Sequence, residues 1–75
     1  MKDKHNLLKL LGLRIRESRI RLGLSQEELA FKADMDRTYI SGVERGVRNP
    51  TFISLVVIAA ALDTSVSHLL ADLGD

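Results

Sequence analysis

Side chains that hydrogen-bond readily gather between positions 37 and 49 of this 75-residue sequence. One stripe of helical spacing comprises Arg37, Thr38, Ser41 and Gly42, with Tyr39 and Arg45 at its margins. A guanidinium can donate two hydrogen bonds to O6 and N7 of guanine, and hydroxyl groups can bond base edges or touch a thymine methyl. Gly42 would permit close approach to the DNA groove. A purely solvated helix would more often carry Glu/Lys pairs here, so we interpret Arg37, Thr38, Ser41 and Gly42 as base-reading residues.

A second polar group is suited to hold the DNA backbone. It comprises Gln26, Tyr39, Arg45, Arg48 and Asn49. Gln26 begins a predicted helix, where free N–H groups and the helix dipole favour an anion. Arg48 and Asn49 lie in the loop after the stripe, and Tyr39 could equally be an edge of the core. Such phosphate contacts set position and register but specify little sequence. For both groups, the alternative is ordinary solvated surface.

Five helices are predicted to position these side chains, at about 7–22, 26–33, 37–44, 52–62 and 66–72. The first presents one apolar face at spacings of three and four, made of Leu8, Leu11, Ile15, Ser18 and Leu22. Gly23 then ends it. The fourth is apolar nearly all round, so we expect it to be central and buried on most sides.

The second and third predicted helices carry clear start signals. Ser25 and Glu28 have the spacing of a capping box, and Leu24 and Leu29 that of a hydrophobic staple. Asp36 repeats the N-cap pattern for the third helix. About three residues join the two helices, and a turn this tight sets them at a large angle. The later helix then stands out from the domain and fits the DNA major groove.

The C-terminal segment carries more apolar residues than one short helix can hide. They are Val66, Leu69, Leu70 and Leu73, in a helix of about 65–73. In a chain this short, the free energy gained by burying apolar surface barely exceeds the entropic cost of ordering the chain. We therefore expect these residues to form a homodimer interface. The alternative is that they close the core of the monomer.

Charge is distributed unevenly along the chain. The net charge is +5 over residues 1–24, −1 over 25–49 and −3 over 50–75, for a total of +1. One part of the molecule therefore favours a polyanion and the other end avoids it, although a solvated face could also produce this asymmetry.

Several functional classes are excluded or disfavoured. Absence of cysteine rules out disulfides, thiolate zinc sites and a cysteine nucleophile, and fits a reducing cytoplasm. His5 and His68 lie far apart and outside any metal-ligand motif. The nearly apolar run at 52–62 is too short for a membrane span. No Ser/His/Asp constellation or phosphate loop is visible, so we expect no enzyme activity, metal or cofactor.

Three stretches of sequence resemble the XRE-type helix-turn-helix family, which includes lambda-type repressors and Cro. They read LSQEELA at 24–30, DRTYISGVERG at 36–46 and RNPT at 48–51. The middle stretch is closely similar to controller proteins of restriction–modification systems, which are small dimeric regulators. The resemblance covers about residues 8–72.

The resemblance implies a compact, all-α, five-helix lambda repressor-like DNA-binding domain over 1–75, with its helix-turn-helix at about 25–45. It implies a homodimer on a palindromic operator, formed mainly by the C-terminal helix. It maps Arg37, Thr38 and Ser41 to bases, maps Gln26, Arg48 and Asn49 to phosphates, and pairs Arg19 with Glu44. Asp34 and Asp63 replace the family's usual glycines, so both are expected in left-handed backbone, which Asp tolerates better than most residues.

The expected partners are double-stranded DNA, a second copy of the chain and, as a further candidate, RNA polymerase. We expect neither membrane binding nor a small-molecule ligand, and the chain has no room for a separate sensor domain. Control would then follow from the protein's own concentration. Two alternatives stay open on the same fold: a phage-type repressor, and an antitoxin or other protein-interaction module.

Overall fold

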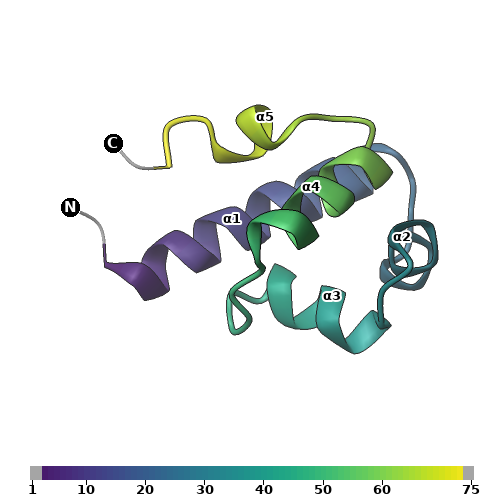
Figure 1. Ribbon diagram of the computed structural model, residues 1–75, viewed down its shortest axis with the longest axis horizontal. Helices are drawn as coiled ribbons and strands as arrows, with labels where there is room; N and C mark the ends of the chain where they lie inside the picture. The colour runs from purple at the N-terminus through teal and green to yellow at the C-terminus, as the bar shows by residue number, and fades with distance from the viewer. Residues whose placement is uncertain (1–2, 74–75) are drawn as a thin grey trace.

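The computed structural model describes residues 3–73 and contains five α-helices in that range (Figure 1). They are α1 (Lys4–Arg21), α2 (Gln26–Ala33), α3 (Arg37–Glu44), α4 (Phe52–Ala61) and α5 (Val66–Leu70). α1 contacts both α3 and α5, which lie on opposite sides of it (Figure 1). The predicted all-α, five-helix architecture is confirmed. No helix within residues 3–73 has the length and apolar character needed to cross a bilayer.

Every helix begins at a side chain that accepts a hydrogen bond from the first turn. The N-caps are Asp3, Ser25, Asp36, Thr51 and Ser65. The predicted capping box is present, because Ser25 Oγ accepts from the Glu28 N–H and Glu28 Oε1 accepts from the Ser25 N–H. α1 starts three residues earlier than expected because Asp3 Oδ1 accepts from the Asn6 N–H at 2.9 Å.

The turn between α2 and α3 uses left-handed backbone at an aspartate. Asp34 has φ 55°, and Asp63 after α4 has φ 58°, as predicted. Immediately after Asp34, the Met35 N–H donates to the Ala30 carbonyl at 2.9 Å, which closes the end of α2. This turn joins α2 to α3 with three residues, Asp34 to Asp36, and fixes where α3 begins.

The core draws at least one side chain from every helix. The largest fully buried residues are Ile15 of α1, Leu29 of α2, Ile40 and Val43 of α3, Ile58 of α4 and Leu69 of α5. α3 is therefore held by its inner face while its outer face remains open. Leu22, predicted for the inner face of α1, is instead 45% exposed at the C-cap of the helix.

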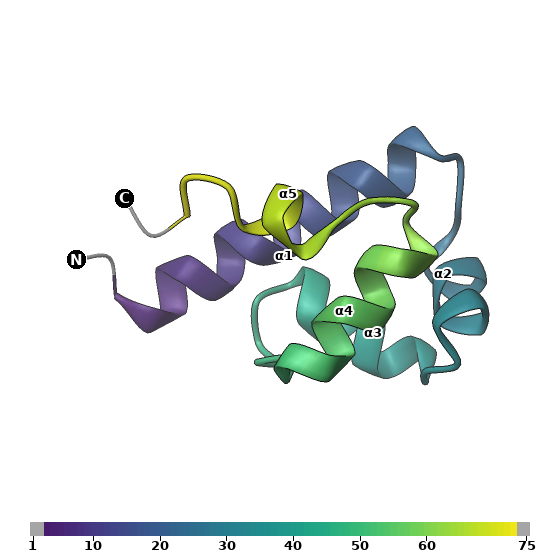
Figure 2. The same ribbon diagram turned by 45° about the horizontal axis from the view of Figure 1, so that its top comes forward.

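The prediction that α4 is buried on most sides is wrong. Leu55, Ile58 and Ala59 face the core, but the opposite side is exposed, and α4 lies uncovered in front of α3 in Figure 2. We call this side the α4 face; it consists of Phe52, Ile53, Val56 and Val57. With no charged residue between positions 51 and 62, the sequence pattern carries no sign of which side is outward.

The expectation of a four-residue interface on the C-terminal helix also needs correction. Leu69 is fully buried and Leu73 nearly so, while Val66 packs partly against the core. They close the core of the monomer because α5 packs on α1 and α4. Of the four, only Leu70 is exposed, at 41%.

Candidate nucleic-acid interface

Arg37 and Thr38 occupy the exposed first turn of α3. Within residues 3–73, the Arg37 guanidinium has no hydrogen-bond or ion-pair partner, so it is free to bind a ligand. Thr38 is more constrained, because its hydroxyl and its backbone N–H both donate to Asp36 Oδ1, at 2.7 and 2.9 Å. These two hydrogen bonds lower the pKa of Asp36 below its ordinary 3.8, and the bond from the Thr38 hydroxyl has the larger effect. Thr38 can therefore offer a duplex its hydroxyl lone pairs and its methyl group.

The remaining residues of the predicted stripe are less accessible. Ser41 is half-buried, and its hydroxyl is 3.4 Å from the Nε donor of Arg45. Gly42 is buried, and the side chain of Arg48 lies directly over it. The prediction that Gly42 meets a DNA groove is therefore wrong, because the space beside its Cα is already filled.

The loop after α3 brings two predicted phosphate contacts together. The Arg48 guanidinium lies over the Tyr39 ring, with Cζ 5.6 Å from the ring centroid. Tyr39 is half-buried and packs against the core. Arg45 and Asn49 are exposed nearby in the chain. The positive groups at this end of α3 therefore face solvent.

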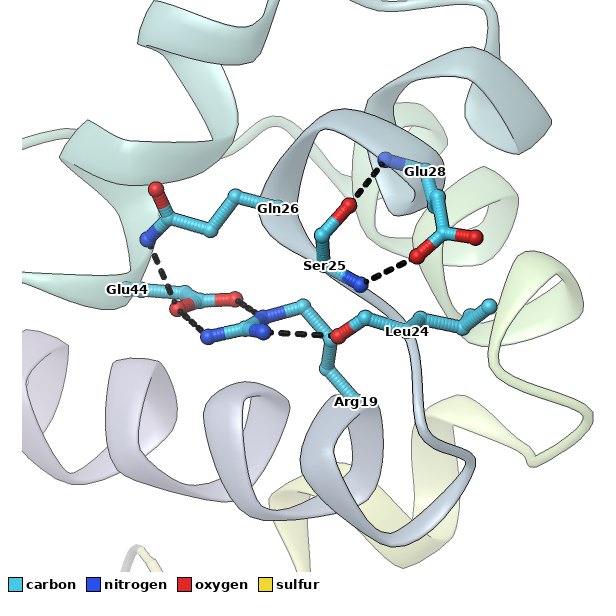
Figure 3. A network of polar contacts seen from close by, with 6 residues as sticks. All are labelled: Arg19, Leu24, Ser25, Gln26, Glu28 and Glu44. Atoms are coloured by element: carbon cyan, nitrogen blue, oxygen red, sulfur yellow. Dashed lines mark hydrogen bonds and ion pairs between the residues drawn. The ribbon is translucent and has the colours of Figure 1, made fainter.

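A polar network anchors α3 from behind (Figure 3). Arg19 of α1 donates Nε to Glu44 Oε2 at 2.6 Å, Nη2 to Glu44 Oε1 at 3.0 Å and Nη1 to the Leu24 carbonyl at 2.8 Å. Gln26 of α2 donates Nε2 to Glu44 Oε1 at 3.0 Å. The predicted Arg19–Glu44 pair is confirmed, and it joins α1, the entry to α2 and the end of α3.

Gln26 has a role that its sequence position did not reveal. Its amide is held by Glu44, so the side chain is fixed rather than free. Gln26 and Arg37 nevertheless line the same open cleft, together with Ser25 and Arg19. The structure thus places a predicted phosphate contact beside a predicted base reader.

The helix-turn-helix family model matches residues 15–69, which include all of α2, α3 and α4. The chain belongs to the helix-turn-helix family. Within it, the protein is similar to Control protein C.BamHI of Bacillus amyloliquefaciens, with 40% identity over 67 residues that cover 88% of this chain and 83% of the relative. The predicted resemblance to controller proteins is confirmed.

Solved structures give the same result for this helix-turn-helix chain. The restriction–modification controller protein C.AhdI from Aeromonas hydrophila has 47% identity and a TM-score of 0.80, covering 85% of this chain and 96% of that one. The controller protein C.Esp1396I, solved as a tetramer in complex with its natural 35 base-pair operator, has 42% identity and a TM-score of 0.80. That match covers 89% of this chain and 88% of C.Esp1396I.

Sequence reasoning missed two exposed apolar features of this helix-turn-helix chain. The α4 face was assigned to the core, and Phe31 of α2, which is 87% exposed, was not singled out. Phe31 lines a surface hollow with Leu24, the acidic Glu27 and Glu28, and the basic Lys32. Its place in a helical pattern of alanines and leucines carried no signal that it points outward.

Proposed function

We propose that the protein is a sequence-specific DNA-binding transcriptional regulator of the restriction–modification controller type. The observation that carries this proposal is the exposed, unpaired guanidinium of Arg37 on a helix that the Arg19–Glu44 pair anchors from behind. A helix of this width fits the major groove, and recognition helices read bases with their N-terminal residues. The operator complex of the similar C.Esp1396I supports the same assignment.

In this proposal α3 enters the groove and the flanking residues hold the backbone. Arg37 would bond a guanine, and Thr38 and Ser41 would contact neighbouring base edges or a thymine methyl. Gln26, Tyr39, Arg45, Arg48 and Asn49 would contact phosphates and set the register. The base-reading set is therefore narrower than the predicted stripe, because Gly42 is excluded from it.

We further propose that two copies bind a palindromic operator as a homodimer. The α4 face supports this, because an uncovered patch of large apolar side chains on a small domain marks an interaction site. Because the α4 face carries no charge, two copies can meet there without like-charge repulsion. A two-fold dimer would place its recognition helices about 34 Å apart, which is one turn of DNA. We expect occupancy of the operator to follow the concentration of the protein, without a cofactor.

Selection of bound duplexes from a random library tests the proposal. We expect enrichment of a two-fold repeat whose half-sites are one helical turn, or a multiple of it, apart. Binding with no enriched sequence would reject specific recognition. An enriched single half-site would instead reject the dimer while keeping the recognition helix.

The exposed Phe31 favours a second candidate function, contact with another protein. An exposed aromatic ring in a hollow that also holds Glu27, Glu28 and Lys32 suits a partner surface that combines apolar and charged groups. For a promoter-bound regulator, we propose RNA polymerase as that partner. Phe31→Ser should then leave operator affinity unchanged and abolish activation of a reporter promoter; unchanged activation would reject this contact.

A further inference from the structure

We propose that Gly42 and Tyr39 are positioning residues that hold Arg48 along α3, so that Arg48 meets a DNA phosphate as part of the recognition helix. This inference rests on the proposed DNA-binding function and adds two residues to it. We call the surface that Gly42 and Tyr39 form under this side chain the Arg48 seat. Without the seat, the side chain of Arg48, four residues beyond the end of α3, would have to be ordered from many rotamers when it meets a phosphate.

The seat exists because Gly42 has no side chain. A Cβ built on Gly42 would stand 2.5 Å from Cγ of Arg48 and 3.5 Å from its Cβ. The distance to Cγ is shorter than two unbonded carbon atoms can approach. The stem of Arg48 therefore occupies the volume that any larger residue at position 42 would take. Gly42 is buried by this contact although it lies on the outer part of α3.

Backbone hydrogen bonds bring Arg48 to this position. The carbonyl of Gly42 accepts from the N–H groups of both Val47 and Arg48, at 3.0 and 3.2 Å. The loop thus folds back on the residue over which the side chain lies. From there the stem runs toward the start of α3, and the guanidinium reaches the ring of Tyr39, one helical turn before Gly42.

Tyr39 completes the seat as a fixed surface. Its ring is packed against the core on one side, so it can support the Arg48 guanidinium on the other. A cation over an aromatic face is attracted by the ring while its N–H groups remain free to donate. Arg48 itself stays exposed, so its donors remain available to a phosphate.

Holding a long side chain before binding removes an entropic cost of binding. A free arginine loses rotamer freedom when it is immobilised at an interface, and a prearranged one loses less. Glycine inside a helix is unfavourable relative to alanine. Gly42→Ala should therefore keep or raise the stability of the protein while it weakens DNA binding, a combination that a purely structural role for Gly42 would not produce.

A double-mutant cycle between Gly42→Ala and Arg48→Ala tests the inference. Binding is measured on a random-sequence 30 base-pair duplex at several salt concentrations, because a phosphate contact acts on all sequences. In the wild-type background, Arg48→Ala should weaken binding about eightfold at about 0.1 M salt and lower the salt slope by about one. In the Gly42→Ala background, the same change should cost less than about twofold. Arg45→Ala, an exposed arginine of the same helix end that does not cover Gly42, is the control and should cost the same in both backgrounds.

Three outcomes would overturn the inference. They are an equal cost of Arg48→Ala in both backgrounds, an unfolding midpoint that falls together with affinity in Gly42→Ala, and no cost of Arg48→Ala in the wild type. A DNA-free measurement separates this failure from failure of the proposed function. Nuclear Overhauser contacts from Arg48 Hγ to Gly42 Hα and from Arg48 Hδ to the Tyr39 ring should be present in the wild type and absent in Gly42→Ala. If they are present but the wild type binds no duplex, the seat stands and the proposed function fails.

Discussion

Arg19 of α1 donates two hydrogen bonds to Glu44 at the end of α3, from Nε to Glu44 Oε2 and from Nη2 to Glu44 Oε1 (Figure 3). The side chain of Glu44 is 3% exposed and that of Arg19 is 11% exposed, so water screens the pair little. The carboxylate also accepts from Gln26, and Arg19 also donates to the Leu24 carbonyl. Because both charges have several partners, removal of either leaves the other buried and underbonded.

We expect Arg19→Met to lower the free energy of unfolding by about 3 kcal/mol, because it leaves the Glu44 carboxylate buried without its counter-charge. Urea unfolding followed by circular dichroism measures this. The control is Arg21→Met, an exposed arginine in the same last turn of α1, whose effect should stay within about 0.5 kcal/mol. Equal effects of the two changes would show that the pair does not anchor α3.

Arg37→Ala should weaken binding to the selected operator by about 1–3 kcal/mol and relax preference at one base position in each half-site. Its affinity for random-sequence DNA should fall much less, because the lost contact is to a base. Fluorescence anisotropy on both duplexes gives the comparison. Equal losses on operator and random DNA would move Arg37 from the base-reading group to the phosphate group.

Ile53→Asp should abolish self-association and leave the monomer folded. Ile53 is 68% exposed in the first turn of α4, where a negative charge interacts favourably with the helix dipole. A buried aspartate at a dimer interface would be costly. Sedimentation velocity measures the oligomeric state. Ile20→Lys, an exposed apolar position near the end of α1, is the matched control and should keep the wild-type state; a dimer that survives Ile53→Asp would exclude the α4 face.

The capping box of α2 should make stability depend on pH in acid. The hydrogen bond from the Ser25 N–H, and then the one from the Ser25 side chain, lower the pKa of Glu28 below its ordinary 4.5. A lowered pKa in the folded state adds stability above pH 4.5, and this stability is lost as pH falls through the folded-state value. Glu28→Gln should therefore be less stable than the wild type at pH 7, and the gap in stability should close as pH falls below 4.5 and through the folded-state pKa. Urea midpoints across this range measure the gap, and a constant gap would contradict the assignment.

Asp34→Gly should raise the free energy of unfolding by about 0.5–1 kcal/mol, because Asp34 has φ 55° and glycine adopts this conformation without steric cost. Asp34→Ala should lower it, since alanine has a Cβ but no polar group suited to this turn. Thermal unfolding of the two variants distinguishes backbone strain from side-chain effects. If both changes act in the same direction, the conformation of residue 34 does not account for the effect.

Local chemistry made most of the fold predictable. Ser25, Asp36 and Thr51 are N-caps with short-range signals, and α2 and α3 have the predicted bounds. The Arg19–Glu44 pair followed from the family resemblance and is present. Tertiary packing decided the rest. Leu69 and Ile53 are similarly apolar, yet Leu69 is fully buried in the core and Ile53 is exposed to solvent.

The site was predictable only in part for a similar reason. The spacing of Arg37 and Thr38 placed them on the exposed first turn of α3, where the structure has them. The same helical spacing placed Gly42 outward but could not show that a loop residue six positions later would cover it. Long-range contacts of this kind depend on how the chain folds back, which periodicity does not record.

The network of Arg19, Gln26 and Glu44 has a consequence for re-engineering this regulator. Its members brace α3 from the inner side, whereas Arg37 takes no part in it. Position 37 can therefore be exchanged for other side chains with little penalty to folding. This separation of scaffold from readout makes the chain a suitable framework for building regulators with altered target sites.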